Sequence, residues 1–244
     1  MSRLSRVLAT ILLIACLPVA AVADEGEDLT LFFRAAVTIE ADGSLSALAW
    51  EDAGKIPAAL RARLDERVHA WTFEPGEIDG RPARTETTLR LRLLATPRDG
   101  ALALHVESAD TGPEMDGVMP PEYPREALRR GAEGQVLAGL VVEPDGTRHV
   151  TLEQYQGDDR HRRVFLEAVK PTLQRIDVRH ERVGGNEVAA RFAVPISFCL
   201  NAGCDMAFAP AADKGTSLPT TAPGQPMPQD SVARLVTNVR GTDI

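Results

Sequence analysis

The feature that most restricts the fold of this sequence is a short internal repeat. Residues 37–43 read VTIEADG and residues 140–146 read LVVEPDG, and both segments are followed by patterns typical of a strand, a helix, a turn and a strand. A repeated order of elements after a self-similar segment indicates an internal duplication. The chain of 244 residues has room for two small domains. We therefore expect two related modules. Because the core of so small a module is thin, we also expect them to bury apolar faces against each other.

Apolar periodicity predicts the elements of the first module. Alternate residues from 29 to 39 are apolar, which indicates a strand, and a turn at 41–43 leads into a second strand over 44–50. Apolar residues recur every three or four positions over 57–71, which predicts an amphipathic helix. Alternation returns over 85–93, and a further strand is expected over 101–106.

The second module follows a loop rich in Gly, Pro and Asp. We expect a short helix over 124–130, a hairpin of strands over 136–142 and 149–154, a helix over 159–176 and a last strand over 187–198. Pro171 should kink or shorten the long helix. The predicted fold class is therefore α+β, with modules at 24–108 and 109–206, each a small antiparallel sheet packed by a helix.

The end of the chain has a different composition. Residues 207–244 are rich in Ala, Pro, Thr, Gly and Gln, with prolines at 219, 223, 226 and 228. Such a composition supplies too few apolar groups for a core, so a disordered tail is predicted. The alternative is a short helical contact element over 232–239.

The first 23 residues have the pattern of a signal peptide. Arg3 and Arg6 precede an apolar run over 7–23, which ends in Ala21-Val22-Ala23 before the acidic residue Asp24. Cleavage after Ala23 would place the mature chain in the periplasm.

Two alternatives for this leader remain open. The segment 13–16 (LIAC) is similar to a lipobox, which would make the protein a lipoprotein through Cys16. The leader would otherwise be an uncleaved inner-membrane anchor, although its apolar run is near the lower limit of about 17 residues for a spanning helix and contains Pro18.

Charge and cysteine content exclude some classes of protein. The formal net charge is −8, which makes nucleic acid an unsuitable partner. Cys199 and Cys204 flank a turn-prone segment, and in an oxidising compartment they are predicted to close a small disulfide loop, with two free thiols as the alternative. Two cysteines are too few for a structural zinc site.

No pattern in the sequence indicates an enzyme. The five histidines occur singly, without the spacing of metal ligands, and there is no phosphate-binding loop, nucleophile elbow or pair of catalytic carboxylates. We predict no catalytic residue, no metal, no cofactor and no small-molecule substrate.

A set of spaced residues in the second half forms a motif. They are Pro121, Tyr123, Pro124, Ala127, Gly134, Asp145 and Gly146, followed by a last strand that ends VPISF at 194–198. These residues have structural roles, such as the start of a helix at Pro124 or a left-handed turn position at Gly146. Together they resemble a known family, the TonB C-terminal domain, most clearly over residues 118–200. The family's usual Trp-x-Phe-x-Pro is absent here but occurs as Trp71–Pro75 in the first half, so residues 29–95 resemble a diverged second copy.

The resemblance implies a function in protein binding. Members of the family lie in the periplasm and grip a short segment of outer-membrane receptors, and the physical mode would be strand addition to an exposed last strand. The candidate edge is formed by Arg191, Phe192, Ala193 and Val194, and Pro195 should limit the pairing. The implied partner is a TonB-dependent outer-membrane receptor or another envelope protein.

The sequence also departs from the pattern of a force-transmitting member. A transducer of the family resembles an anchored rod with a long proline-rich spacer, and no such spacer lies between residue 24 and the first module, nor does the leader contain a histidine. The predicted function is therefore that of a periplasmic TonB-like protein-binding module. The alternatives are a membrane-anchored energy transducer with an uncleaved leader, and a structural envelope protein or lipoprotein without receptor binding.

Overall fold

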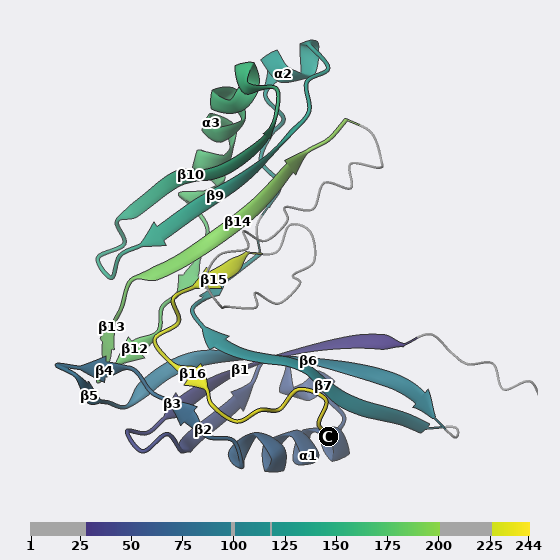
Figure 1. The fold of residues 1–244 in the computed structure, drawn as a ribbon, viewed down its shortest axis with the longest axis vertical. Coiled ribbons are helices and arrows are strands. Elements are labelled where there is room, and N and C mark those ends of the chain that lie inside the picture. Colours follow the sequence, from purple (N-terminus) through teal and green to yellow (C-terminus); the bar gives the residue numbers. More distant parts are fainter. Residues whose placement is uncertain (1–27, 99–100, 118, 201–225) are drawn as a thin grey trace, which may run out of the picture.

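The computed structural model describes residues 28–98, 101–117, 119–200 and 226–244, and Figure 1 shows how they form two modules. Each module is an antiparallel sheet with a helix packed against it. Within the described residues, no helix has the length and apolar character needed to span a membrane.

Four long strands form the sheet of the first module, in the order β2-β1-β6-β7. The strands are β1 (Leu29–Ile39), β2 (Leu45–Trp50), β6 (Thr85–Arg98) and β7 (Ala101–Gly112). Alternate residues of β6, such as Leu89 and Leu91, are buried because successive side chains of a strand point to opposite faces. They pack in one core with Leu64 and Val68 of α1 (Ala58–His69), as the helical spacing predicted.

Shorter elements connect these strands. They are the 3₁₀ turn η1 (Ala53–Lys55), the two-residue strand β3 (Phe73–Glu74), the hairpin of β4 (Glu77–Ile78) and β5 (Arg81–Pro82), and β8 (Glu114–Met115) after β7. β7 runs to Gly112, so the predicted boundary at 108/109 is wrong: it falls inside a strand that pairs with β6 up to its last residue.

The second module has a sheet of three long strands, in the order β10-β9-β14. They are β9 (Gly134–Val142), β10 (Arg148–Gly157) and β14 (Ala190–Phe198). Helices α2 (Arg125–Arg129) and α3 (Arg162–Leu173), with the 3₁₀ turn η2 (Asp159–His161) between β10 and α3, complete the module. Phe165, Val169 and Leu173 of α3 are fully buried against the sheet. Pro171 lies in the last turn, and the helix ends two residues later, short of the predicted residue 176.

The repeated segments form the same turn in the two modules. Gly43 and Gly146 have φ of 84° and 83°, a region that favours glycine. The aspartate before each glycine accepts a hydrogen bond from a backbone N–H two residues on, at 3.0 Å for Asp42 and 2.8 Å for Asp145. The surroundings differ, because a side chain at Gly43 would overlap the carbonyl oxygen of Phe73, whereas Gly146 faces open space. The duplication itself remains a prediction.

The modules meet through strand pairing. β12 (Arg182–Val183), which forms a hairpin with β13 (Asn186–Glu187), pairs with Thr85 and Glu86 of β6, and β11 (Val178–Arg179) pairs with β8. The two apolar cores are separate clusters among the described residues. Backbone pairing and polar contacts join the modules, and Val183 of β12 is 4% exposed with its methyl groups close to Gly76 of the first module. The expected burial of apolar faces between the modules is therefore limited to such local contacts.

The prediction of a disordered tail over 207–244 is wrong for residues 226–244, which we call the strap. Strap residues form β15 (Met227–Gln229) beside β14 and β16 (Arg234–Leu235) beside β3, and the yellow ribbon in Figure 1 passes from the second module to the first. Composition predicted disorder because the strap has no core of its own, but it obtains order from edges that the two sheets provide. The alternative of a helix over 232–239 is also wrong, and residues 207–225 lie outside the described residues.

Candidate protein-binding edge

The candidate site is the outer edge of β14. All nine residues of β14 pair with β9 on one side, while on the other side β15 pairs with Arg191, Phe192 and Ala193 alone. In an antiparallel sheet the backbone groups of successive residues point to alternate neighbours. The pairing with β15 therefore places the amide and carbonyl groups of Arg191 and Ala193 on the outer edge, and those of Phe192 toward β9.

The four predicted edge residues have different environments. Phe192 and Val194 are buried in the core under α3 and have no side chain available to a partner. Ala193 is also buried, whereas Arg191 is exposed. The edge thus offers backbone hydrogen bonds and one charged side chain.

Pro195 marks the end of the usable edge. By the same alternation, its nitrogen lies on the outer side, where it has no hydrogen to donate. The observed pairing with β15 stops at Ala193, two residues earlier. The usable edge is therefore short.

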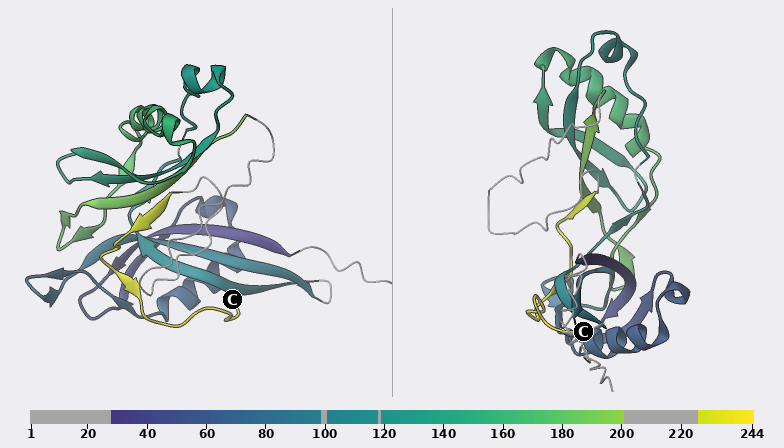
Figure 2. Two further views of the ribbon diagram at one scale, coloured as in Figure 1. Left: turned by 45° about the horizontal axis from the view of Figure 1, so that its top comes forward. Right: turned by 90° about the vertical axis from the view of Figure 1, so that its right-hand side faces the viewer.

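The edge is occupied by the chain itself, which sequence reasoning missed. Met227 lies opposite Ala193, Pro228 opposite Phe192 and Gln229 opposite Arg191. A proline is tolerated at Pro228 because the Phe192 position does not require an N–H from its partner strand. In Figure 2, the short β15 arrow lies alongside β14 in both views.

A buried carboxylate joins the strap to both modules. Glu181, in the loop before β12, is 3% exposed and accepts hydrogen bonds from the hydroxyl of Thr87 (2.7 Å), the hydroxyl of Ser231 (2.9 Å) and the backbone N–H of Val232 (3.0 Å). These donors come from the first module and the strap. No sequence signal identified Glu181, because a lone glutamate in a hairpin resembles any surface acid.

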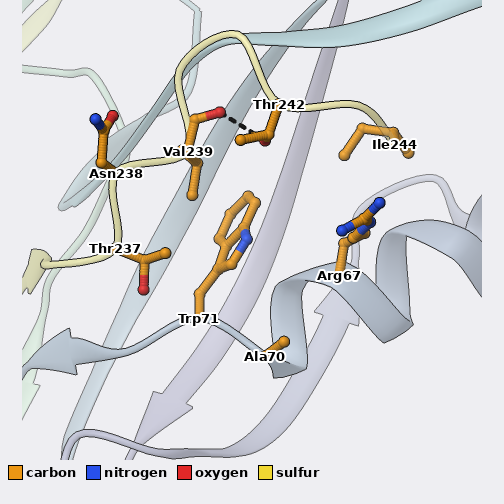
Figure 3. Close-up of a pocket in the computed structure, with 8 residues that line it drawn as sticks. All are labelled: Arg67, Ala70, Trp71, Thr237, Asn238, Val239, Thr242 and Ile244. Carbon is orange, nitrogen blue, oxygen red and sulfur yellow. Dashed lines mark hydrogen bonds between the residues drawn. The ribbon is translucent and has the colours of Figure 1, made fainter.

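Beyond Val232 the strap packs on the first module. Ala233, Val239 and Ile244 are buried in its core. Figure 3 shows the loop around Val239 and Thr242 standing over the ring of Trp71 at the end of α1, beside a shallow pocket of about 210 Å³. This part of the strap therefore belongs to the first module.

The motif residues of the second module build its helix-to-sheet contact. The Tyr123 hydroxyl donates to the carbonyl of Ala132 (2.6 Å), and its ring meets the ring of Phe198 edge-on at 5.6 Å. Pro124 is the N-cap of α2, one position before the predicted one, and Ala127 is fully buried.

The other motif residues serve turns and close packing. A Cβ at Gly134 would lie 3.0 Å from the Phe165 ring, so a larger residue there would require this buried ring to shift. The backbone N–H of Thr147 holds the pKa of Asp145 below its ordinary value, because this hydrogen bond favours the ionised carboxylate. Pro121 is half-buried ahead of α2.

Cys199 follows β14 directly and is disulfide-bonded. Cys204 lies outside the described residues, so the predicted pairing of the two cysteines stays a prediction. Among the described residues, no group of three His, Cys, Asp or Glu side chains is arranged to hold a metal ion.

Fold and edge together define the second module as a small α+β domain with an edge strand that accepts an added strand. The model of the family described as Gram-negative bacterial TonB protein C-terminal matches residues 119–200. Residues 119–200 are therefore a TonB C-terminal domain, as predicted. The diverged second copy at 29–95 remains a prediction.

Two curated relatives are similar to this chain. Both are Protein TonB, from two strains of Xanthomonas campestris pv. campestris, and each is 30% identical over 97 residues. The match covers 38% of this chain and 42% of each relative, so it spans less than half of either protein. No solved structure matches.

Proposed function

We propose that this chain is a periplasmic TonB-like module that binds an extended segment of an envelope protein by strand addition to β14. A TonB-dependent outer-membrane receptor is the partner that the family relationship favours. The observation that carries the proposal is that the outer edge of β14 takes an antiparallel strand in the folded chain.

Strand addition at this edge follows from elementary energetics. Unpaired N–H and C=O groups along a sheet edge pair with any extended backbone, and alternate side chains then set the selectivity. Here Arg191 is the exposed side chain beside the edge, so a partner segment with an acidic residue nearby is favoured.

A second candidate function follows from the same pairing. β15 already pairs with the edge, so in this second function β14 serves only to hold the strap, and the protein is a structural envelope component without receptor binding. The two functions differ in whether β14 ever contacts another protein.

Photo-cross-linking in the envelope distinguishes these functions. We would place a benzophenone amino acid at Arg191, beside the edge, and at Glu167, an exposed position on α3, as the matched control. Receptor binding predicts cross-links from position 191 to an outer-membrane receptor, with none from position 167. Cross-links from 191 to the strap alone would support the structural role.

A further inference from the structure

We propose that residues 226–230 are an exchangeable occupant of the partner-binding edge, and that residues 232–244 stay on the first module when this occupant leaves. The strap would then be an autoinhibitory latch, tethered so that it returns to β14. The inference rests on the proposed function, because an occupant inhibits only if a partner uses the same edge.

Among the residues that the structure describes, the occupant is held by few interactions. Its pairing with β14 covers three residues, and two of the four residues from Pro226 to Gln229 are prolines without an N–H. All four are only half-buried, and none belongs to either apolar core. Segments with few buried contacts open at low free energy, so this part of the strap can leave without unfolding either module.

Residues 232–244, which we call the anchor of the strap, are held by more interactions. Its backbone pairs with the edge of β7 through three hydrogen bonds: Val106 N–H to Thr242 O (2.9 Å), Gly241 N–H to Val106 O (2.8 Å) and Ile244 N–H to Leu104 O (3.0 Å). Residues Arg234 and Leu235 pair with β3, and the Val236 N–H donates to the carbonyl of Thr72 at 2.9 Å.

A hinge separates the two parts. Asp230 is exposed and has φ of 53°, a left-handed conformation that a non-glycine residue adopts at a cost. Directly after it, Ser231 and Val232 are fixed by the carboxylate of Glu181. At Asp230 the chain therefore changes direction, and the loosely held occupant gives way to the firmly held anchor.

Tethering makes a weak occupant an effective competitor. A segment linked to its site by a short chain has an effective concentration on the order of millimolar. A partner must compete with this local concentration, and its apparent affinity is its intrinsic affinity multiplied by the fraction of molecules in which the edge is open. Removing the occupant should therefore strengthen binding without any change in β14.

The test uses the full chain with two strap variants. Met227→Pro with Gln229→Pro removes the two amide hydrogens that face β14, whereas Met227→Thr with Gln229→Thr keeps them and serves as the control. Residue-resolved hydrogen exchange reports both parts of the strap: Arg191 and Ala193 for the occupant, and Val106, Val236 and Ile244 for the anchor.

In the proline variant, the amide hydrogens of Arg191 and Ala193 should exchange at least tenfold faster than in the wild type. The exchange rates of the three anchor amides should be unchanged. The threonine variant should resemble the wild type. Unchanged exchange at Arg191 and Ala193, or simultaneous loss of protection at the anchor amides, would overturn the proposed division of the strap.

The cross-linker at position 191, repeated in the proline variant, tests the inhibition. A several-fold higher yield of receptor cross-links than in the wild-type strap supports it. Equal, nonzero yields overturn the inhibition and leave the proposed function standing. Absence of receptor cross-links in both backgrounds overturns the proposed function instead.

Discussion

The Glu181 carboxylate accepts a hydrogen bond from the Thr87 hydroxyl, with 2.7 Å between the oxygens, although the two residues belong to different modules. The same carboxylate also holds Ser231 and Val232, so one buried side chain connects both modules with the strap. Polar groups at such a junction are costly to leave without partners.

Glu181→Ala should therefore destabilise the protein by about 2–4 kcal/mol, because the Thr87 hydroxyl and the Val232 amide lose their acceptor, whereas the Ser231 hydroxyl keeps the carbonyl of Ala233 at 2.7 Å. Glu181→Gln, which keeps one acceptor oxygen, should cost less. Urea unfolding measures both free energies. A change below about 0.5 kcal/mol for the alanine variant would show that water replaces the carboxylate without loss.

The equivalent turn glycines provide a matched pair of substitutions. Gly43→Ala and Gly146→Ala place a side chain at nearly the same positive φ, which costs about 1–2 kcal/mol in either module. Only at Gly43 does the new Cβ overlap the Phe73 carbonyl. The Gly43→Ala variant should therefore lose a further ~1–3 kcal/mol of unfolding free energy. Thermal and urea unfolding of the two variants test this, and equal losses would contradict the close approach.

The pKa of Asp158 should be about 2, below its ordinary value of 3.8, chiefly because the Arg160 side chain donates hydrogen bonds to the ionised carboxylate. Because folding lowers this pKa, the resulting stabilisation is complete above about pH 4 and is lost as the pH falls toward 2.

Carboxyl NMR titration measures this value directly. Arg160→Ala should raise the pKa of Asp158 toward 3.8 and leave Asp145 unchanged, because the pKa of Asp145 is lowered by Thr147. An unshifted Asp158 in the wild type would contradict the ion pair.

The mature N-terminus distinguishes the three interpretations of the leader, namely a cleaved signal peptide, an uncleaved membrane anchor and a lipoprotein signal. Intact mass and N-terminal sequencing of protein from its native envelope should show a free N-terminus at Asp24. Retention of residues 1–23 in an inner-membrane fraction would instead support the anchored transducer, and a lipidated Cys16 would support the lipoprotein.

Much of the fold was predictable because apolar periodicity acts over short distances. The spacing of Leu64 and Val68 identified α1, and the alternation around Leu89 identified β6. The last strand of the family motif likewise predicted β14, whose use as a binding edge stays a prediction.

The strap was not predictable, because its order depends on contacts with residues that are distant in the sequence. Its buried residues Ala233, Val239 and Ile244 have no regular spacing, and their partners lie more than a hundred residues away in the sequence. The edge of β14 was predicted to be open, and only the folded chain reveals that Met227 to Gln229 pair with it.

The anchor of the strap makes the first module discontinuous in sequence. Its core uses residues from β1 to β7 together with Ala233, Val239 and Ile244, so the TonB C-terminal domain is topologically an insertion between these two parts. A chain that is synthesised from its N-terminus cannot complete the first module until residues 232–244 have been made. The TonB C-terminal domain can therefore fold, with β14 still uncovered, before the first module is complete.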